Sequence, residues 1–431
     1  MSLEKIKKRV QCERGIALVI VLTAVMALMI IVVEFAYTTR VNYSMAQNLR
    51  DRLQAEYLAR SALQISLLVI KFQRQIDSVQ SRVGQNVTLF GSGPLYQQIP
   101  IDSLLLRAAN AQGNSDLQLN SEEQKDLTDF LNFSGDFYAK IEDEQGKINI
   151  NALASNQAQT NQASGQGNPN SNPTPTPPQQ GDGQGQNAPL TVGQLTFEQI
   201  LALIESDEYD DLFDDIINRE TLIYNIMDWA DEDRRRNGFE GGLEDNLYIN
   251  HEPPYKAKNA KFDSIEEIAF VDGVNQGFLD KFQSSLTVYG KSNQLNINTA
   301  SRTLLKGFIR KLINSRNDEE IEEIVDWIEE FRNFKNKEDF LGGLLTNFGY
   351  ETADLDDALL DTLIFQSSFF SITATGTVGG SISEPDSRPI TATIRAVVTE
   401  ASSGNSSSAQ RGRSKQAGYP GGLKFLYWRM Q

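Results

Sequence analysis

The sequence predicts an α+β fold in which a long N-terminal helix packs on an antiparallel sheet and a large all-helical domain is inserted into that sheet. Three observations predict it. Residues 40–75 contain neither Gly nor Pro and follow an uncharged apolar run. Strand-like alternation of apolar and polar residues occurs in two separated places, 137–151 and 369–399. The segment between them, 191–370, has the apolar spacing of helices.

The composition of the 431 residues excludes several classes of site. The single Cys excludes an intramolecular disulfide framework and a thiolate zinc finger, and the single His excludes a multi-histidine metal centre. A formal net charge of −17 makes the chain a poor ligand for phosphate backbones. We therefore expect no nucleic-acid partner.

The N-terminus predicts a membrane anchor. Residues 1–15 carry five basic and two acidic side chains, and residues 16–33 carry no charge. Eighteen helical residues span about 27 Å, close to the hydrocarbon thickness of a bilayer. The basic flank stays cytoplasmic, so the bulk of the chain lies across the membrane. A cleaved secretory signal peptide fits less well, because the apolar run is long and Glu34 to Tyr37 offer no small-residue cleavage site.

The next segment, 34–75, is predicted to continue the same helix as an amphipathic stretch. Apolar residues recur at every fourth position in Val41, Met45, Leu49, Leu53 and Tyr57. A second, drifting stripe follows in Leu58, Ala62, Ile65, Val69 and Phe72. This spacing predicts roughly 60 helical residues in one piece from Ile16 onward.

The body divides by composition. Residues 76–155 are predicted as the first part of an α/β domain, with a β-hairpin or strand pair over Phe137–Asn151 that turns at Gln145-Gly146. Residues 156–189 are almost wholly polar, Gly, Pro and Ala, which predicts a disordered low-complexity insertion. Residues 369–431 complete the sheet with two strands joined by a loop at Gly379–Pro389 and a last strand over 423–430.

The region between, 190–368, is predicted as an acidic helical domain. Over 191–370 the chain has 37 Asp and Glu against 17 Lys and Arg, a net charge of −20. Five segments have helical patterns: 195–206, 220–233, 262–271, 299–313 and 318–331. The stretch from Asn296 resembles half of a helix-hairpin-helix or SAM-like unit, with Asn298-Thr299 as the cap of a helix that begins near Ala300. The negative charge favours a structural cap over contact with DNA.

Two clusters of carboxylates in this domain predict a cation site. Asp228, Asp231 and Asp233 precede a Gly-rich basic turn, and Glu244 and Asp245 follow it. Calcium prefers six to eight oxygen ligands on flexible loops, and the spacing is not that of an EF-hand. By spacing alone the alternative is a solvated acidic loop paired with the arginines at 234–236.

The leader resembles the class III signal of type IV pilins and type II secretion pseudopilins. In those families a prepilin peptidase cuts after the Gly that precedes the apolar run, which here is Gly15, and the new N-terminal residue, here Ile16, is N-methylated. Most members have Glu at the fifth mature position, where this chain has Ile20. The departure is a habit of one subtype, the K-type minor pseudopilin.

Three further segments resemble that K-type family in the same order along the chain. They are Asp143–Asn151 (DEQGKININ), Asp228–Tyr248 (DW-x-D-x-D followed by G-x-E-D-x-x-Y) and Leu295–Ser301 (LNINTAS). The resemblance implies a pilin-like fold and a structural calcium ion in the helical domain. It assigns the calcium to Asp231, Asp233, Glu244 and Asp245, with Asp228 as a further ligand.

The resemblance also implies a function. The chain would be a structural subunit at the tip of the type II secretion pseudopilus, anchored in the inner membrane with its body in the periplasm. There it would initiate assembly with I-type and J-type minor pseudopilins and support export of folded proteins. No catalytic residue is predicted. The alternatives are a minor pilin of a type IV pilus and a membrane-anchored periplasmic metal-dependent enzyme.

Overall fold

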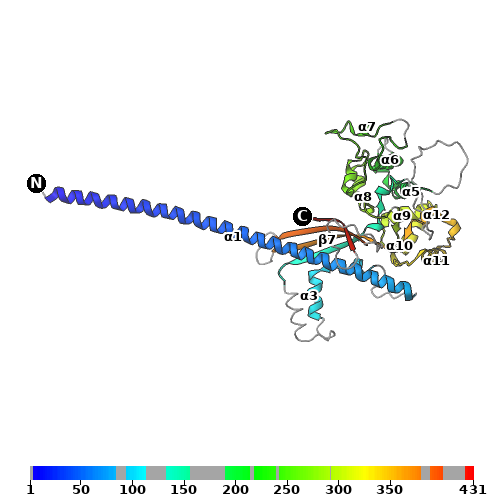
Figure 1. Ribbon diagram of the computed structural model, residues 1–431, viewed down its shortest axis with the longest axis horizontal. Helices are drawn as coiled ribbons and strands as arrows, with labels where there is room; N and C mark the ends of the chain where they lie inside the picture. Colours follow the sequence, from blue (N-terminus) through cyan, green and yellow to red (C-terminus); the bar gives the residue numbers. More distant parts are fainter. Residues whose placement is uncertain are drawn as a thin grey trace, which may run out of the picture.

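The computed structural model describes residues 3–83, 94–112, 133–155, 190–213, 218–238, 242–291, 293–379, 389–400 and 423–431. Within these ranges the chain forms a long helix, a five-stranded sheet and a helical domain. Figure 1 shows the helix running from the N-terminus to the sheet, with the helical domain at the far end of the molecule. The predicted α+β fold, with a helix on an antiparallel sheet and an inserted helical domain, is confirmed.

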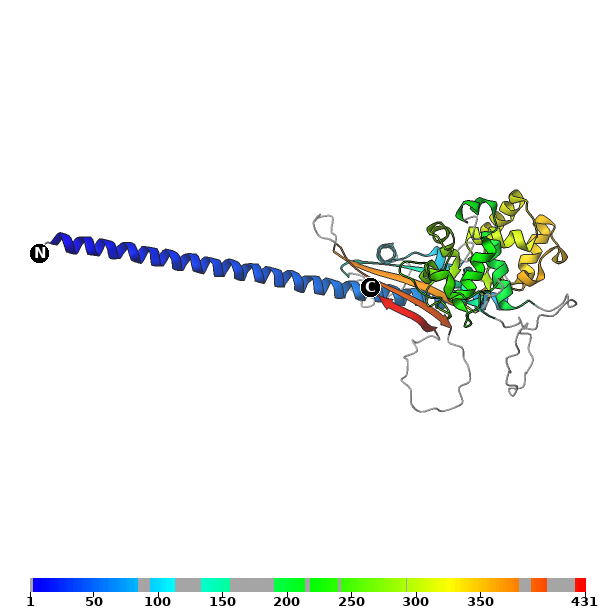
Figure 2. The ribbon, with the colours of Figure 1, turned by 90° about the horizontal axis from the view of Figure 1, so that it is seen from above.

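The first helix, α1, spans Leu3–Val83, 81 residues in one piece, and is longer than the sequence predicts. Only its second half is covered. The side chains that pack on the sheet begin at Ala55 and continue through Ala59, Ala62, Leu67 and Ile70. The upstream stripe, Val41 to Tyr57 at every fourth residue, is exposed, because this part of α1 projects beyond the sheet (Figure 2).

The sheet is antiparallel throughout, in the order β1-β2-β7-β8-β9. Its strands are β1 Ile101–Asp102, β2 Asp136–Asp143, β7 Phe369–Val378, β8 Ile390–Glu400 and β9 Leu423–Met430. Two short helices accompany it, α2 Leu95–Gln98 and α3 Ser103–Gln112. β2 pairs with β7 along its whole length, so the strands on either side of the helical insertion are neighbours, as the sequence predicts.

Small residues let α1 approach the sheet closely. Ala55 and Ala59 of α1 are fully buried against Gly376 of β7. A Cβ atom built on Gly376 would overlap the backbone oxygen of Ala55 and the backbone nitrogen of Ala59. The helix axis can lie at this distance only because neither partner carries a larger side chain.

The predicted hairpin over 137–151 is wrong. β2 ends at Asp143, and a 3₁₀ turn, η2 Glu144–Gly146, carries the chain out of the sheet. The next strand, β3 Ile148–Asn149, pairs in parallel with β4 Leu286–Thr287 of the helical domain. The Asp143 carboxylate accepts a hydrogen bond from the Gln145 amide, which stabilises this 3₁₀ turn.

The helical domain starts earlier than the predicted boundary between 155 and 190. Ile148, Ile150 and Leu153 lie in its hydrophobic core rather than in that of the sheet. Its α-helices are α5 Val192–Ile204, α6 Arg219–Ala230, α7 Asp245–Tyr248, α8 Gln276–Phe282, α9 Arg302–Leu312, α10 Asp318–Glu330, α11 Lys337–Phe348 and α12 Asp357–Leu360. Its 3₁₀ helices are η3 Ile150–Ala152, η4 Asp207–Leu212, η5 Ile265–Phe270, η6 Gln283–Ser285 and η7 Thr352–Asp354.

Two details of the predicted helices differ in the structure. The pattern over 262–271 forms only the 3₁₀ helix η5. The helix expected to begin near Ala300 begins at Arg302, because Ser301 accepts the capping hydrogen bond from the Leu304 amide. Asn298 is instead buried, and its side chain binds the backbone of Phe334.

The predicted low-complexity insertion, 156–189, lies outside the described residues. The residues at its two ends are adjacent. The Gly193 amide donates to the Ser155 carbonyl at 3.0 Å. Directly beyond it, Thr191 and Gln194 form a capping box that starts α5.

Candidate metal centre

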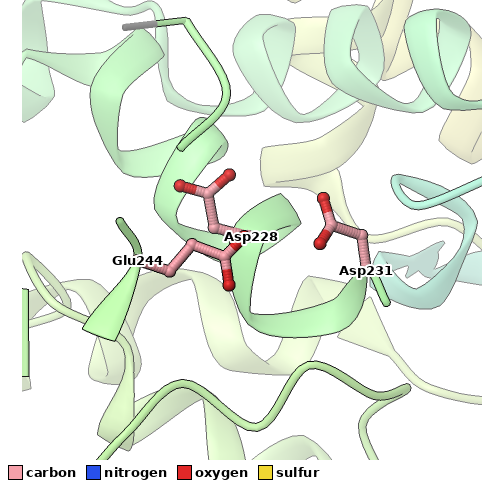
Figure 3. A group of neighbouring side chains, drawn as sticks. All are labelled: Asp228, Asp231 and Glu244. Carbon is pink, nitrogen blue, oxygen red and sulfur yellow. The ribbon is translucent and has the colours of Figure 1, made fainter. Parts of the chain in front are cut away.

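Three carboxylates converge at the C-terminal end of α6. Asp228 lies in the last turn of that helix, Asp231 is its C-cap residue, and Glu244 precedes the short helix α7. One oxygen from each lies within 4.8 Å of the others (Figure 3). Two oxygens bound to one calcium ion at about 2.4 Å are separated by at most about 5 Å, so this spacing suits a shared ion.

The local backbone explains how residues sixteen apart in sequence meet. After α6 the chain reverses direction, and Arg235 and Leu243 form an antiparallel bridge. The Glu244 amide donates to the Arg234 carbonyl at 3.3 Å, which returns Glu244 to the end of α6. Residues 239–241 of this turn, including Gly241, lie outside the described residues.

The three carboxylates are not satisfied by the protein. Asp228 and Glu244 are buried, with exposed fractions of 0% and 1%. Each of the three has one buried oxygen with no hydrogen-bond partner: Oδ2 of Asp228, Oδ1 of Asp231 and Oε1 of Glu244. A buried carboxylate oxygen without a donor is costly, and three in one place are an arrangement that a bound cation would stabilise.

The pKa values of all three carboxyl groups are raised. Burial, followed by repulsion from the neighbouring carboxylates, raises the pKa of Glu244 to about 8. Burial also raises the pKa of Asp231 to about 6, against a hydrogen bond from Asn237 that lowers it. The pKa of Asp228 is raised by burial as well. A cation would supply the charge that these groups lack.

Two asparagine side chains, which sequence reasoning missed, lie between the carboxylates. The Asn237 amide donates to Asp228 Oδ1 at 2.7 Å and to Asp231 Oδ2 at 2.8 Å. The Asn259 amide donates to Glu244 Oε2 at 2.9 Å and to the backbone carbonyl of Asp233. Asn237 lies inside the predicted loop and could have been proposed from its residue type, whereas nothing in the sequence relates Asn259 to the cluster.

Two of the five predicted ligands are placed elsewhere. The Asp233 carboxylate accepts a hydrogen bond from the Arg235 amide, although its backbone carbonyl faces Asn259 near the cluster. The Asp245 carboxylate lies 3.7 Å from the ammonium group of Lys256. The structure therefore brings together Asp228, Asp231 and Glu244, and separates the side chain of Asp245 from them.

The two other segments that resemble the K-type family, Asp143–Asn151 and Leu295–Ser301, meet at the junction between the helical domain and the sheet. Asp143, at the end of β2, is buried and accepts four hydrogen bonds. Its donors are the Gln145 amide at 2.8 Å, Asn296 Nδ2 at 3.1 Å, Thr299 Oγ1 at 2.6 Å and Ser367 Oγ at 2.5 Å. A Cβ atom on Gly146 would lie 2.7 Å from Thr299 Oγ1. Both crossings between sheet and helical domain, at Asp143 and at Ser367, are thus tied to one carboxylate.

Comparison with known proteins gives two findings. The family model described as type II secretion system protein K matches residues 146–291, which begin at the turn after Asp143 and include the carboxylate cluster. Over that third of the chain the sequence is similar to this family. A chain of the crystal structure of the GspK-GspI-GspJ complex from the type 2 secretion system of enterotoxigenic Escherichia coli is similar at 18% identity and a TM-score of 0.42. The similarity covers 76% of this chain and 92% of that one.

No curated protein matches the sequence. The match to the protein K model supports a minor pseudopilin of type II secretion. The apolar part of α1 is consistent with a single-pass anchor, because its best 18-residue window has a mean hydropathy of 3.3 and none of that window is buried in the protein.

Proposed function

We propose that the chain is a structural subunit at the tip of the type II secretion pseudopilus, where it initiates assembly with I-type and J-type minor pseudopilins and supports export of folded proteins. One observation supports the tip position above the others. The helical domain is inserted between β2 and β7 and lies at the end of α1 opposite the N-terminus (Figure 1). A subunit with this bulk beyond its sheet leaves no room for another subunit to stack above it.

The N-terminus supports the same position. Cleavage after Gly15 would make Ile20 the fifth mature residue, where most pilin-like subunits have Glu. That Glu normally neutralises the free N-terminus of the adjacent subunit. A subunit without it suits a place at which no neighbour needs that contact.

Processing gives the first test. N-terminal sequencing of the protein from inner membranes should return N-methylated Ile16, produced by prepilin peptidase. Gly15→Ala should remain as an uncleaved precursor, and Gly91→Ala, a substitution far from the junction, should be processed normally. An intact Met1 in the wild-type protein, or a cut beyond residue 33, would refute the pseudopilin assignment and reopen the reading as an anchored enzyme.

We infer that a calcium ion occupies the carboxylate cluster. Asp228, Asp231 and Glu244 would each direct the oxygen that now lacks a donor to the ion. The side chains of Asn237 and Asn259 contact the other oxygens of these carboxylates, and the carbonyl of Asp233 contacts Asn259. Each amide would present its own oxygen after a half-turn of its last torsion. Such a set reaches the six oxygens that calcium prefers. The ion would stabilise the fold and takes no part in a reaction.

Calcium titration of the full chain in detergent, followed by calorimetry, tests this site. Asp231→Asn should weaken calcium binding by at least about tenfold, as loss of a ligand does. Asp245→Asn is the matched control, because the two residues were predicted together but only Asp231 lies in the cluster. Equal losses from both variants would contradict the ligand set. Unchanged calcium binding by the Asp231→Asn variant would refute the proposed calcium site.

A type IV pilus minor pilin remains the alternative assembly, and the match to protein K of type II secretion favours the pseudopilus. Deletion of the gene distinguishes them. Loss of protein export with intact twitching supports the proposal, whereas loss of surface pili with intact export supports the alternative.

A further inference from the structure

The two edges of the sheet are built differently. At one edge β1 has only two residues, and the chain turns directly into α3, which shortens the exposed edge. At the other edge β9 has eight residues, and no strand among the described residues pairs with its outer side (Figure 2). Proteins usually shorten or cover an edge of this length, because it offers a row of unpaired backbone groups.

The register shows which backbone groups face outward. Gln431 and Thr393 exchange two backbone hydrogen bonds, at 2.9 and 3.0 Å. The pairs then step evenly from there to Val397↔Tyr427. Since the bonds alternate along an antiparallel pair, the N–H and C=O groups of Tyr427 and Arg429 point toward β8, and those of Trp428 and Met430 point away from the sheet.

One face of this edge is apolar. Trp428 lies opposite Ala396, which packs in the core under α1, so its ring is on the same face as the helix. α1 packs mainly over β2, β7 and β8, and leaves the ring 49% exposed. Leu426, at the irregularity of β9, is 43% exposed. A strand with large apolar residues at an open edge favours a partner over solvent.

On the opposite face, the edge formed by β8 and β9 is basic. Arg395 of β8 and Arg429 of β9 are directly opposed in the register, both are exposed, and neither forms an ion pair within the described residues. Like charges at opposed positions destabilise a strand pair. Lys424 adds a third positive charge at the other end of β9, and β9 has no acidic residue. β9 therefore supplies no carboxylate to these cations, and the acidic side chains nearest to this face, Glu142 and Glu144, belong to β2 and the turn after it.

We propose that β9 is a docking strand for an extended segment of a neighbouring pseudopilin subunit, in which apolar side chains alternate with acidic ones. The segment would hydrogen-bond to the outward groups of Trp428 and Met430, cover Trp428 with its apolar side chains and place its carboxylates beside Arg395 and Arg429. A second copy of this chain does not fit at β9, since β9 paired with itself would bring Lys424 and Arg429 of both copies together. The inference rests on the proposed function, because it needs other subunits.

Photo-crosslinking tests the surface directly. The full chain is expressed in its own cells with p-benzoylphenylalanine in place of Trp428, and the I-type and J-type pseudopilins are detected after irradiation. Tyr138, an equally exposed aromatic residue of β2 at the other side of the sheet, is the matched control position. We expect at least tenfold more crosslinked subunit from position 428 than from position 138.

Failure of the docking strand and failure of the proposed function give different results in this experiment. If neighbouring subunits co-purify with the unmodified chain but crosslink equally or better from position 138, the docking strand is refuted and the proposed function stands. If no subunit co-purifies with the unmodified chain, the proposed function fails, and the docking strand fails with it.

Substitutions separate backbone pairing from side-chain contact. Trp428→Pro removes an outward N–H without removing a bond to β8, and Trp428→Phe keeps that N–H. We expect the amount of co-purified subunit to fall at least tenfold in the proline variant and less than threefold in the phenylalanine variant. Arg429→Glu should also lower the amount of co-purified subunit tenfold, with a melting temperature no lower than that of the wild type because it relieves the repulsion with Arg395. Full recovery of partner with both Trp428→Pro and Arg429→Glu would overturn the proposal.

Discussion

The sheet body and the helical body bury polar groups in different ways. The core of the sheet body is aliphatic and aromatic. Away from the junction, the buried polar side chains among its described residues are neutral, namely Ser66, Ser103 and Thr399. The helical body and its junction with the sheet bury the carboxylates of Asp143, Glu144, Asp228 and Glu244. The stability of the first body therefore depends on close packing. That of the second depends on how each carboxylate is neutralised or hydrogen-bonded.

The largest effect is expected where the two bodies meet. Asp143→Ala removes the acceptor of four hydrogen bonds and leaves buried donors from both bodies without partners. We expect a loss of about 4 kcal/mol in the free energy of unfolding. Asp136→Ala, at the exposed end of the same strand, should cost no more than about 1 kcal/mol. Chemical denaturation of both variants checks this. Equal losses would show that the hydrogen bonds to Asp143 do not stabilise the junction.

The packing of the sheet body is tested by Gly376→Ala. The added methyl group overlaps the backbone of α1 at Ala55, so the helix must shift away from β7. We expect a loss of about 3 kcal/mol, at the upper end of the range for overpacked cores. Gly342→Ala is the control, because a Cβ atom there meets nothing within 4 Å in a helix, and it should be neutral or stabilising. A tolerated Gly376→Ala would show that α1 is loosely held.

Calcium should separate the two bodies thermally. At a calcium concentration one hundred times the dissociation constant, the helical body should gain about 2.7 kcal/mol, and the sheet body should gain nothing. Differential scanning calorimetry of the full chain with calcium or EGTA measures the two transitions. A transition that moves equally for both bodies would mean that they unfold as one unit. No movement at all would contradict calcium binding.

In the absence of calcium, a rise in pH should lower the stability of the folded protein, by a smaller amount than calcium raises it. The raised pKa values of Glu244, about 8, and Asp231, about 6, mean that the folded protein binds more protons than the unfolded one between the ordinary and the raised values. The free energy of unfolding should therefore fall as the pH rises from 5 to 8. Glu244→Gln should flatten this slope and abolish the calcium response. Identical slopes in the variant and the wild type would exclude Glu244 as the cause.

The smallest effect should follow replacement of residues 156–189 by a short Gly-Ser bridge. The two ends are already held together by the bond from Gly193 to Ser155, so the fold loses no contact among the described residues. We expect a change below about 1 kcal/mol, since loop length enters only through a logarithm. A collapse of the melting temperature would refute the prediction of a disordered insertion.

Much of the fold was predictable because each element carries a local pattern. The strands of 369–378 and 390–400 alternate clearly, the helices of 192–204 and 318–330 have apolar spacing, and the first of these helices also has a capping box. The hairpin at 137–151 was mispredicted because a partner of β3 lies more than a hundred residues away, at Leu286. Alternation predicts a strand but does not identify the strand with which it pairs.

The candidate metal centre shows the same limit. Acidic residues in a Gly-rich loop indicated Asp228, Asp231 and Glu244, which the structure brings together. Spacing could not separate Glu244 from Asp245, because adjacent residues differ only in the direction of their side chains. Asn259 was missed since it reaches the cluster through tertiary contact alone. Conversely, the stripe from Val41 to Tyr57 looked like a packed face, yet no described element covers it.

That uncovered part of α1 sets the distance between the apolar anchor and the sheet. Residues 34–53 lie between the apolar anchor and the first side chains covered by the sheet, and at 1.5 Å per residue they form a rigid arm of about 30 Å. With residues 16–33 in a bilayer, the body stands clear of the lipid headgroups by roughly the width of a small domain. Partners can then approach the open edge of the sheet at β9 while the subunit is still anchored. The clearance depends on the number of residues in the arm, so seven more helical residues would extend it by about 10 Å.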